Sequence, residues 1–314
     1  MALYNLQYIN GSPRFHHHSH FVPRSPSRSN SLRHVTPMKI TKITMSRDHN
    51  QSSYCASITA DIEAHLKQSI TLKPPLSVFE PMYHLVFSAP PNSAPALCVA
   101  ACELVGGRRS QAIAAASALH LMHAASFTHE HLLLTDRPNS KPMVHHAYGP
   151  NIELLIPDAI VPFGCELLAR SDDPAQNDSD RVLRVIVEIT RAIGSRGIID
   201  GQYQEKVVSR SNGDEMNDDN NEWIDYTCRK KEGGLHACAA ACGAILGGAN
   251  EEEIEILRKF GLYVGMIQGY STRIGSKGKE LERVVEELRN LALKELEHFK
   301  GRKVEAISSF ILGL

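Results

Sequence analysis

The segment 129–136, which reads His-Glu-His-Leu-Leu-Leu-Thr-Asp, carries the side chains in this chain best suited to metal chemistry. Carboxylates such as those of Glu130 and Asp136 are ligands that a hard divalent cation prefers, whereas the imidazole of His131 is a poor ligand for Mg²⁺. Asp158 is a further carboxylate downstream. An altered acidic metal site built from Glu130, Asp136 and Asp158 is therefore one chemistry open to the chain.

Two Cys-x-x-x-Cys pairs in alanine-rich stretches form the second feature: Cys98 with Cys102, and Cys238 with Cys242. Residues i and i+4 share one helix face, where small cysteines let another helix approach closely. The spacing leaves core packing and partner contact both open. A zinc site is disfavoured because zinc-binding cysteines usually occupy a tight turn. A disulfide within a pair is disfavoured because both Cβ atoms leave the helix side by side.

Other polar clusters are explained without chemistry. His120 and His123 are expected to be packed or hydrogen-bonded within the bundle. The acidic residues of segment 209–222 are expected to form a solvated loop, because no rigid element fixes them as metal ligands. The remaining cysteines are expected to be ordinary buried thiols, namely Cys55, Cys165 and Cys228.

The composition sets the class of protein. The chain has 314 residues and 42% hydrophobic residues, enough for one sizeable core. A net charge of −1 gives no electrostatic basis for binding nucleic acid or an anionic membrane, and no apolar run is long enough to span a bilayer. Seven cysteines, an odd number without a secretory signal, argue against a disulfide framework.

The first 47 residues differ from the rest because they contain no acidic residue and many arginines and serines. This composition is typical of an organellar transit peptide, so residues 1–48 are expected to be a disordered transit peptide and residues 49–314 the folded domain. A disordered basic tail is the alternative. The histidines of segment 16–20 could bind metal, but they belong to this leader.

Helical periodicity dominates after the leader, and no run of alternating β-branched residues predicts a sheet. The sequence therefore predicts an all-α bundle of about ten helices in a single domain. The expected helical segments are 58–70, 78–87, 96–105, 112–125, 151–169 (irregular near its prolines), 179–193, 222–230, 235–246, 251–268, 279–299 and 304–311.

Three segments, 96–107, 118–129 and 243–248, resemble helices of plant geranylgeranyl diphosphate synthases, which are trans-isoprenyl diphosphate synthases. The small subunits of plant heteromeric geranyl diphosphate synthases are of two types. The cysteine pairs and the substituted segment 129–138 make the chain most similar to the first type. The resemblance covers nearly everything from about Tyr54 onward. It implies an isoprenoid-synthase-type helical bundle.

The same resemblance implies that both metal motifs are degenerate. Catalytic relatives use two aspartate-rich motifs to hold the Mg²⁺ ions that neutralise the departing diphosphate. The first corresponds to Glu130, His131 and Asp136, where the longer Glu130 would displace a metal. By register, the second motif corresponds to Thr272, Arg273 and Ser276, none of which is acidic. The arginine would put a positive charge where a cation must sit.

The basic loop that binds the homoallylic diphosphate in catalytic relatives is also lost. Its residues correspond to Pro91, Asn92 and Ala94, none of them charged. Lys231 matches a lysine of the family's Lys-Thr pair, but its neighbour is Glu232. No intact catalytic, metal or substrate site is therefore expected in this chain.

The resemblance implies a non-catalytic regulatory subunit that binds a geranylgeranyl diphosphate synthase large subunit in the plastid stroma, as a heterodimer or heterotetramer. The large subunit would supply the Mg²⁺, and its product would shift toward geranyl diphosphate for monoterpene biosynthesis. The partner interface would include Cys98, Cys102, Cys238 and Cys242. Two alternatives stay open: an active short-chain prenyltransferase with an altered metal site, and an isoprenoid-binding module.

Overall fold

Glycines, prolines and caps divide the chain into a series of helices. The computed structural model describes residues 41–132, 147–172, 178–211, 221–273 and 278–312, which contain helices and no strand. This confirms the predicted all-α fold. In chain order the elements are α1 Thr41–Ser69, α2 Leu76–Ser88, α3 Ala94–Leu104, α4 Arg109–Glu130, α5 Pro150–Ala169, α6 Ser179–Ile193, α7 Ile198–Ser211, α8 Asn221–Cys228, the π-helix η2 Arg229–Gly233, α9 Gly234–Gly247, α10 Glu251–Ser271, α11 Gly278–Leu296, the 3-10 helix η3 Glu297–Phe299 and α12 Glu305–Leu312.

The helix boundaries follow local chemistry. Helix α3 is followed by Gly106 at φ +97° and α9 by Gly248 at φ +84°, a backbone region that favours glycine. The Asn250 side chain accepts a hydrogen bond from the Glu253 N–H and caps α10. Helix α5 remains one continuous helix in spite of its internal prolines, Pro157 and Pro162.

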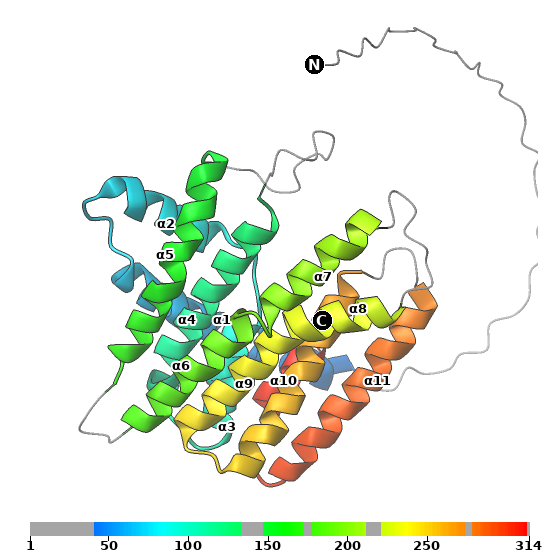
Figure 1. The fold of residues 1–314 in the computed structure, drawn as a ribbon. Helices are drawn as coiled ribbons and strands as arrows, with labels where there is room; N and C mark the ends of the chain where they lie inside the picture. Colours follow the sequence, from blue (N-terminus) through cyan, green and yellow to red (C-terminus); the bar gives the residue numbers. More distant parts are fainter. Residues whose placement is uncertain (1–40, 133–146, 173–177, 212–220, 274–277, 313–314) are drawn as a thin grey trace, which may run out of the picture. The chain divides into compact units, whose positions relative to one another are not determined.

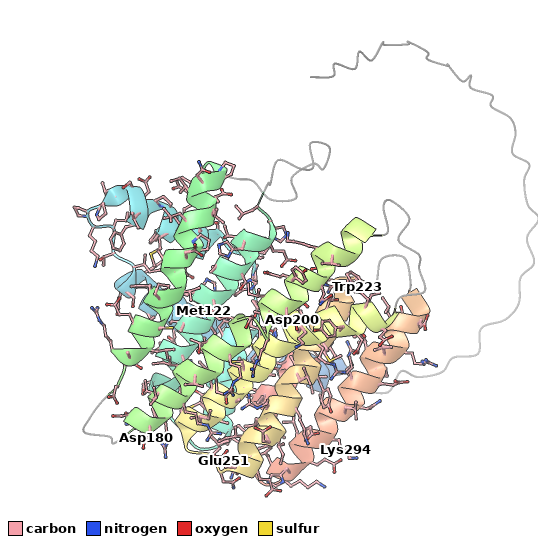
Figure 2. The ribbon with its side chains drawn as sticks, in the orientation of Figure 1. Met122, Asp180, Asp200, Trp223, Glu251 and Lys294 are labelled. Carbon is pink, nitrogen blue, oxygen red and sulfur yellow. The ribbon has the colours of Figure 1, made fainter. Side chains whose placement is uncertain are left out.

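Helix α9 lies at the centre of the bundle and packs against α3, α4, α6 and α10 (Figure 1). Small residues allow the backbones to approach closely. A Cβ added at Gly243 would lie 1.9 Å from the backbone oxygen of Cys98 in α3, and one added at Gly265 would lie 2.2 Å from that of Glu232 in η2. Side chains fill the remaining space between the helices (Figure 2).

Helix α7 is the main element that the sequence pattern did not predict. Its buried side chains among residues 198–207 are Ile198 and the polar Gln202, with Gly201 between the two. This inner face lacks the apolar stripe by which an amphipathic helix is recognised. The predicted loop 209–222 begins within α7, and its residues 212–220 lie outside the described part of the chain.

The expected leader lies mostly outside the described residues. Helix α1 begins at Thr41, and the boundary at residue 49 stays a prediction. None of the helices in the described ranges combines the length and apolar character needed to cross a membrane.

Candidate functional site

The first predicted motif lies at the C-terminal end of α4. Glu130 is the last residue of that helix and His131 follows as its C-cap, while Asp136 lies outside the described residues. The Glu130 side chain is 28% exposed, and its carboxylate is paired within the protein: its Oε1 is 2.5 Å from Lys231 Nζ, and its Oε2 is 3.4 Å from Gln202 Nε2 on α7. A side chain expected to be a degenerate metal ligand is therefore ion-paired within the protein.

Lys231 projects from the π-helix η2 and is only 8% exposed. Its Nζ donates to Glu130 and also, at 2.7 Å, to Glu205 Oε2 on α7. Burial alone would lower the pKa of Lys231, but the charges of these two carboxylates outweigh burial and raise it. Lys231 is thus a buried cation shared by two anions.

Arg273, two residues after the end of α10, supplies a second cation. It lies 3.5 Å from Glu205 Oε1 and 3.7 Å from Glu232 Oε1, and it donates at 2.8 Å to the backbone oxygen of Gly269. Thr272 bonds locally, to the same carbonyl, and Ser276 lies outside the described residues. We call the linked side chains the charge cluster: Glu130, Glu205, Lys231, Glu232 and Arg273.

The charge cluster brings together residues from α4, α7, η2 and the end of α10. The pKa of Glu205 reflects the charges around it. Burial would raise this pKa, but the positive charges of Lys231 and Arg273 outweigh burial and lower it. Burial raises the pKa of Glu232, with Arg273 opposing, and its Oε2 is buried without a hydrogen-bond partner. The cluster contains three carboxylates and two cations, and protein cations already neutralise most of its negative charge.

The charge cluster does not fit Mg²⁺. A magnesium ion needs near-octahedral oxygen ligands about 2.1 Å away, and a protein ammonium or guanidinium beside those oxygens opposes it. Lys231 Nζ contacts both Glu130 and Glu205, and Arg273 contacts Glu205 and Glu232. No group of three or more potential metal ligands is present among the residues that the structure places.

The residues that correspond to the basic loop form hydrogen bonds and packing contacts at the start of α3 instead. The Asn92 side chain accepts a hydrogen bond from the Ala94 N–H at 2.8 Å, and Ala94 is fully buried. Ser93 Oγ lies 2.8 Å from Nε2 of the buried His236. Burial lowers the pKa of His236 to about 4, so the ring is neutral at pH 7. Its Nδ1–H then donates to the Glu232 backbone oxygen.

The other predicted polar residues have ordinary partners. His120 bonds to the backbone oxygen of Val86 on α2 and His123 to that of Pro90 in the α2–α3 connection, which confirms that they are hydrogen-bonded within the bundle. Asp158 is 68% exposed and lies 3.7 Å from His129. Cys228 is buried as predicted, whereas the prediction for two other cysteines was wrong because both are only half-buried: Cys55 and Cys165.

The two cysteine pairs lie inside the subunit. Cys98 and Cys102 on α3, and Cys238 and Cys242 on α9, are at most 3% exposed. Burial raises the pKa of Cys98 and Cys102, which keeps these thiols protonated and unreactive. The four thiols are therefore buried between helices of the same subunit, and their place in a partner interface stays a prediction.

This arrangement predicts how cysteine variants behave. Cys242→Ser should destabilise the folded subunit by about 1–3 kcal/mol, because it buries a hydroxyl in an apolar contact. Cys242→Ala should have a smaller effect, and Cys165→Ser, at a half-buried position, should change little. Thermal unfolding of the isolated chain measures this. Unchanged stability of Cys242→Ser together with lost partner binding would instead favour direct thiol contact.

Several residues of the site escaped prediction. Gln202 and Glu205 lie three apart on α7, a helix that was not predicted, and His236 lies within the second cysteine-containing helix. The i, i+3 spacing of a polar pair is a signal too weak to find them. Their roles depend on which helices become neighbours.

Comparisons with known proteins agree on one family. The polyprenyl synthetase family profile matches residues 78–268. The chain is 73% identical over 281 residues to heterodimeric geranylgeranyl pyrophosphate synthase small subunit 2, chloroplastic, from Cannabis sativa. The matched region covers 88% of this chain and 97% of that relative. The structure is similar to the geranyl diphosphate synthase small subunit from Antirrhinum majus (TM-score 0.76, 55% identity, 83% of this chain and 98% of that chain). It is also similar to a mint deletion mutant of heterotetrameric geranyl pyrophosphate synthase in complex with ligands (TM-score 0.73, 50% identity, 83% and 99%).

Proposed function

The chain belongs to the polyprenyl synthetase family, and we propose that it acts there as a non-catalytic regulatory small subunit. It binds a geranylgeranyl diphosphate synthase large subunit and directs the product toward geranyl diphosphate. The observation that carries the proposal is the charge cluster, in which Lys231 and Arg273 lie among the carboxylates of Glu130, Glu205 and Glu232.

The chemistry of the family supports the proposal that this arrangement does not sustain turnover. Ionisation of an allylic diphosphate needs divalent cations to stabilise the leaving group. Here the cationic side chains are already paired with carboxylates, so they are not available to a diphosphate, and the carboxylates are not available to a metal. The capping role of Asn92 and the burial of Ala94 leave no basic loop for the second diphosphate. The proposed subunit therefore needs no cofactor, and Mg²⁺ belongs to the large subunit.

The names of the relatives support the assembly. One relative is called the small subunit of a heterodimeric synthase, and one similar structure is of a heterotetrameric synthase. The Cannabis name gives geranylgeranyl pyrophosphate as the product, whereas the two structure names give the geranyl compound. We propose the shorter product for this chain, with residues 1–48 as a transit peptide that delivers it to the plastid stroma. The word chloroplastic in the relative's name supports the plastid part of this proposal.

The proposal is tested by assaying the full chain with isopentenyl and dimethylallyl diphosphates and Mg²⁺, alone and mixed with a large subunit. We expect no product above background from the chain alone. The mixture should form more geranyl diphosphate relative to geranylgeranyl diphosphate than the large subunit does alone. Chromatography of the dephosphorylated products measures the ratio.

The control for partner-dependent turnover is a large subunit whose own aspartate-rich motifs are disabled. That mixture should be inactive, because the small subunit has no working site to contribute. Turnover by the isolated chain, or by the mixture with a disabled large subunit, would show that this chain is catalytic. An unchanged product ratio would refute the directing role alone.

A further inference from the structure

A cavity of about 330 Å³ lies between α1, α2 and α4, and none of its lining residues belongs to the charge cluster. Ile62 and Leu66 of α1 supply apolar lining and are almost fully buried. Tyr83 and Phe87 of α2 add aromatic lining, with ring centroids 4.4 Å apart. Pockets for small molecules have this composition, because apolar and aromatic side chains supply the contact area and a few polar groups fix the orientation of the ligand.

His120 of α4 supplies a hydrogen-bond acceptor to this cavity. Its Nε2 lies 3.0 Å from the backbone oxygen of Val86 on α2, and burial lowers the pKa of the ring, so His120 is neutral at pH 7. The Nε2–H therefore donates to Val86, which leaves a lone pair on Nδ1. Within the described part of the chain, Nδ1 makes no hydrogen bond. A ligand that donates an O–H complements this atom.

The charged residues of the cavity favour a neutral ligand. Glu63 and Lys67 lie one turn apart on α1, are about half exposed, and pair with each other, with Oε1 2.5 Å from Nζ. Lys67 Nζ also lies 5.9 Å from the centre of the Phe87 ring. An anionic ligand would have to approach Glu63 and a cationic ligand would have to approach Lys67, so a ligand of either charge meets a like charge.

The volume of the cavity sets the size of the ligand. An apolar cavity of about 150 Å³ holds one benzene molecule, so a cavity of about 330 Å³ has room for roughly twice as many non-hydrogen atoms, about a dozen. An alcohol of about ten carbons has this size. The helices that bound the cavity are packed elements of the bundle, since α2 packs against α4 (Figure 1) and Ile62 and Leu66 of α1 belong to the core.

We propose that this cavity, which we call the α1–α2 pocket, binds a neutral apolar alcohol of about ten carbons. The hydroxyl of the ligand donates to Nδ1 of His120, and its hydrocarbon part packs against Tyr83, Phe87 and the buried apolar side chains of α1. The pocket lies within one subunit, so binding needs neither a metal nor a partner chain. The inference therefore goes beyond the proposed function and does not depend on it.

The test titrates the full chain at pH 7 with geraniol, a ten-carbon alcohol, by isothermal titration calorimetry. We expect saturable binding with a dissociation constant of about 10–100 µM, which is ordinary for a ligand of this size. Geranyl methyl ether, which lacks the O–H donor, and geranyl diphosphate, which carries negative charge, should each bind at least tenfold more weakly. Farnesol should bind no more tightly than geraniol, because its five extra carbons find no room.

Two tryptophan variants locate the binding site. Thr59→Trp fills the pocket from an exposed position of α1 and should weaken geraniol binding at least tenfold, with the unfolding temperature little changed. Gln68→Trp is the matched control, since it adds the same side chain at an exposed position of α1 about two and a half turns further on, on the opposite face. It should bind geraniol like the wild type.

His120→Phe tests the hydrogen bond, because it keeps a ring at this position and removes the acceptor. It should abolish the preference for geraniol over geranyl methyl ether. The variant also loses the bond to Val86, so its thermal unfolding is measured beside the titration. If His120→Phe does not fold, the comparison of the two ligands on the wild-type chain decides the role of the hydroxyl.

Several outcomes would overturn the proposal. Undiminished geraniol binding by Thr59→Trp would place the alcohol elsewhere on the chain. Equal affinity of the wild type for geraniol and its methyl ether, or tighter binding of geranyl diphosphate, would contradict recognition of a neutral alcohol. Absence of saturable binding to the wild-type chain would show that the pocket takes no such ligand. None of these results involves a large subunit, so the proposed function stands or fails separately.

Discussion

Replacing Lys231 by methionine is expected to destabilise the folded subunit by about 2–4 kcal/mol, since it leaves two partly buried carboxylates, 28% and 26% exposed, without their counterion. Lys231 is 8% exposed and is the shared partner of Glu130 and Glu205. Chemical denaturation at pH 7 measures the loss. Lys300→Met, which removes a largely exposed pair, should change stability by less than about 1 kcal/mol.

The pH dependence of this effect identifies its origin. The pKa of Glu205 is lowered in the fold, so its stabilising contribution is present above its unfolded pKa and is lost as the pH falls through the folded value. The pKa of Lys231 is raised, so its contribution is lost only as the pH rises above the ordinary lysine range. Wild type and Lys231→Met should therefore differ most between about pH 5 and pH 10 and converge in acid.

Adding Glu205→Gln to Lys231→Met distinguishes an ion-pair effect from simple loss of packing. Removal of the unpaired carboxylate should recover part of the stability, giving a coupling between the two positions of the same order as the single effects. Strict additivity of the two substitutions would show that the two side chains do not stabilise one another.

Gly265→Ala should destabilise the fold by more than about 4 kcal/mol, although alanine is the better helix former by about 1 kcal/mol. The added methyl would lie 2.2 Å from the backbone oxygen of Glu232 and 2.8 Å from Gly233 Cα, so two backbones must separate. The loss should appear as a lower unfolding temperature or as insoluble protein.

Gly234→Ala provides the contrast for this prediction. Gly234 is also helical, but its added methyl would meet only the Arg229 backbone oxygen at 3.6 Å, an ordinary contact. This variant should be as stable as the wild type or slightly more stable. Equal effects at the two positions would indicate that helix propensity, and not the distance between α10 and η2, determines the outcome.

The fold was predictable because the spacing of apolar residues along the sequence indicates which side chains are buried. Ile58, Ile62, Leu66 and Ile70 fall four apart and are all buried, and the Gly-Gly sequences after α3 and α9 end those helices. Helix α7 could not be predicted from the spacing of apolar residues, for a physical reason. Its contacts with the bundle are polar, so the pattern that reveals a helix points outward.

The site was predictable only in part. The missing aspartates and the odd placement of Arg273 can be seen in the sequence, but the pairing of Lys231 with Glu205 cannot. Ion pairs between residues 26 apart depend on how η2 and α7 cross, which no local pattern specifies. The cysteine pairs show the same limit: their shared helix face was predictable, and whether that face meets another helix of the same subunit or another chain was not.

The positive charges of the cluster are carried by Lys231 and Arg273, which are covalent parts of the chain. A protein that takes its cations from solution gains stability in proportion to the logarithm of their concentration, and loses it when they are withdrawn. The charge cluster does not take its cations from solution. We therefore expect chelators and swings in free magnesium to leave the shape of the small subunit unchanged, so that ionic conditions act on the assembly through the large subunit alone.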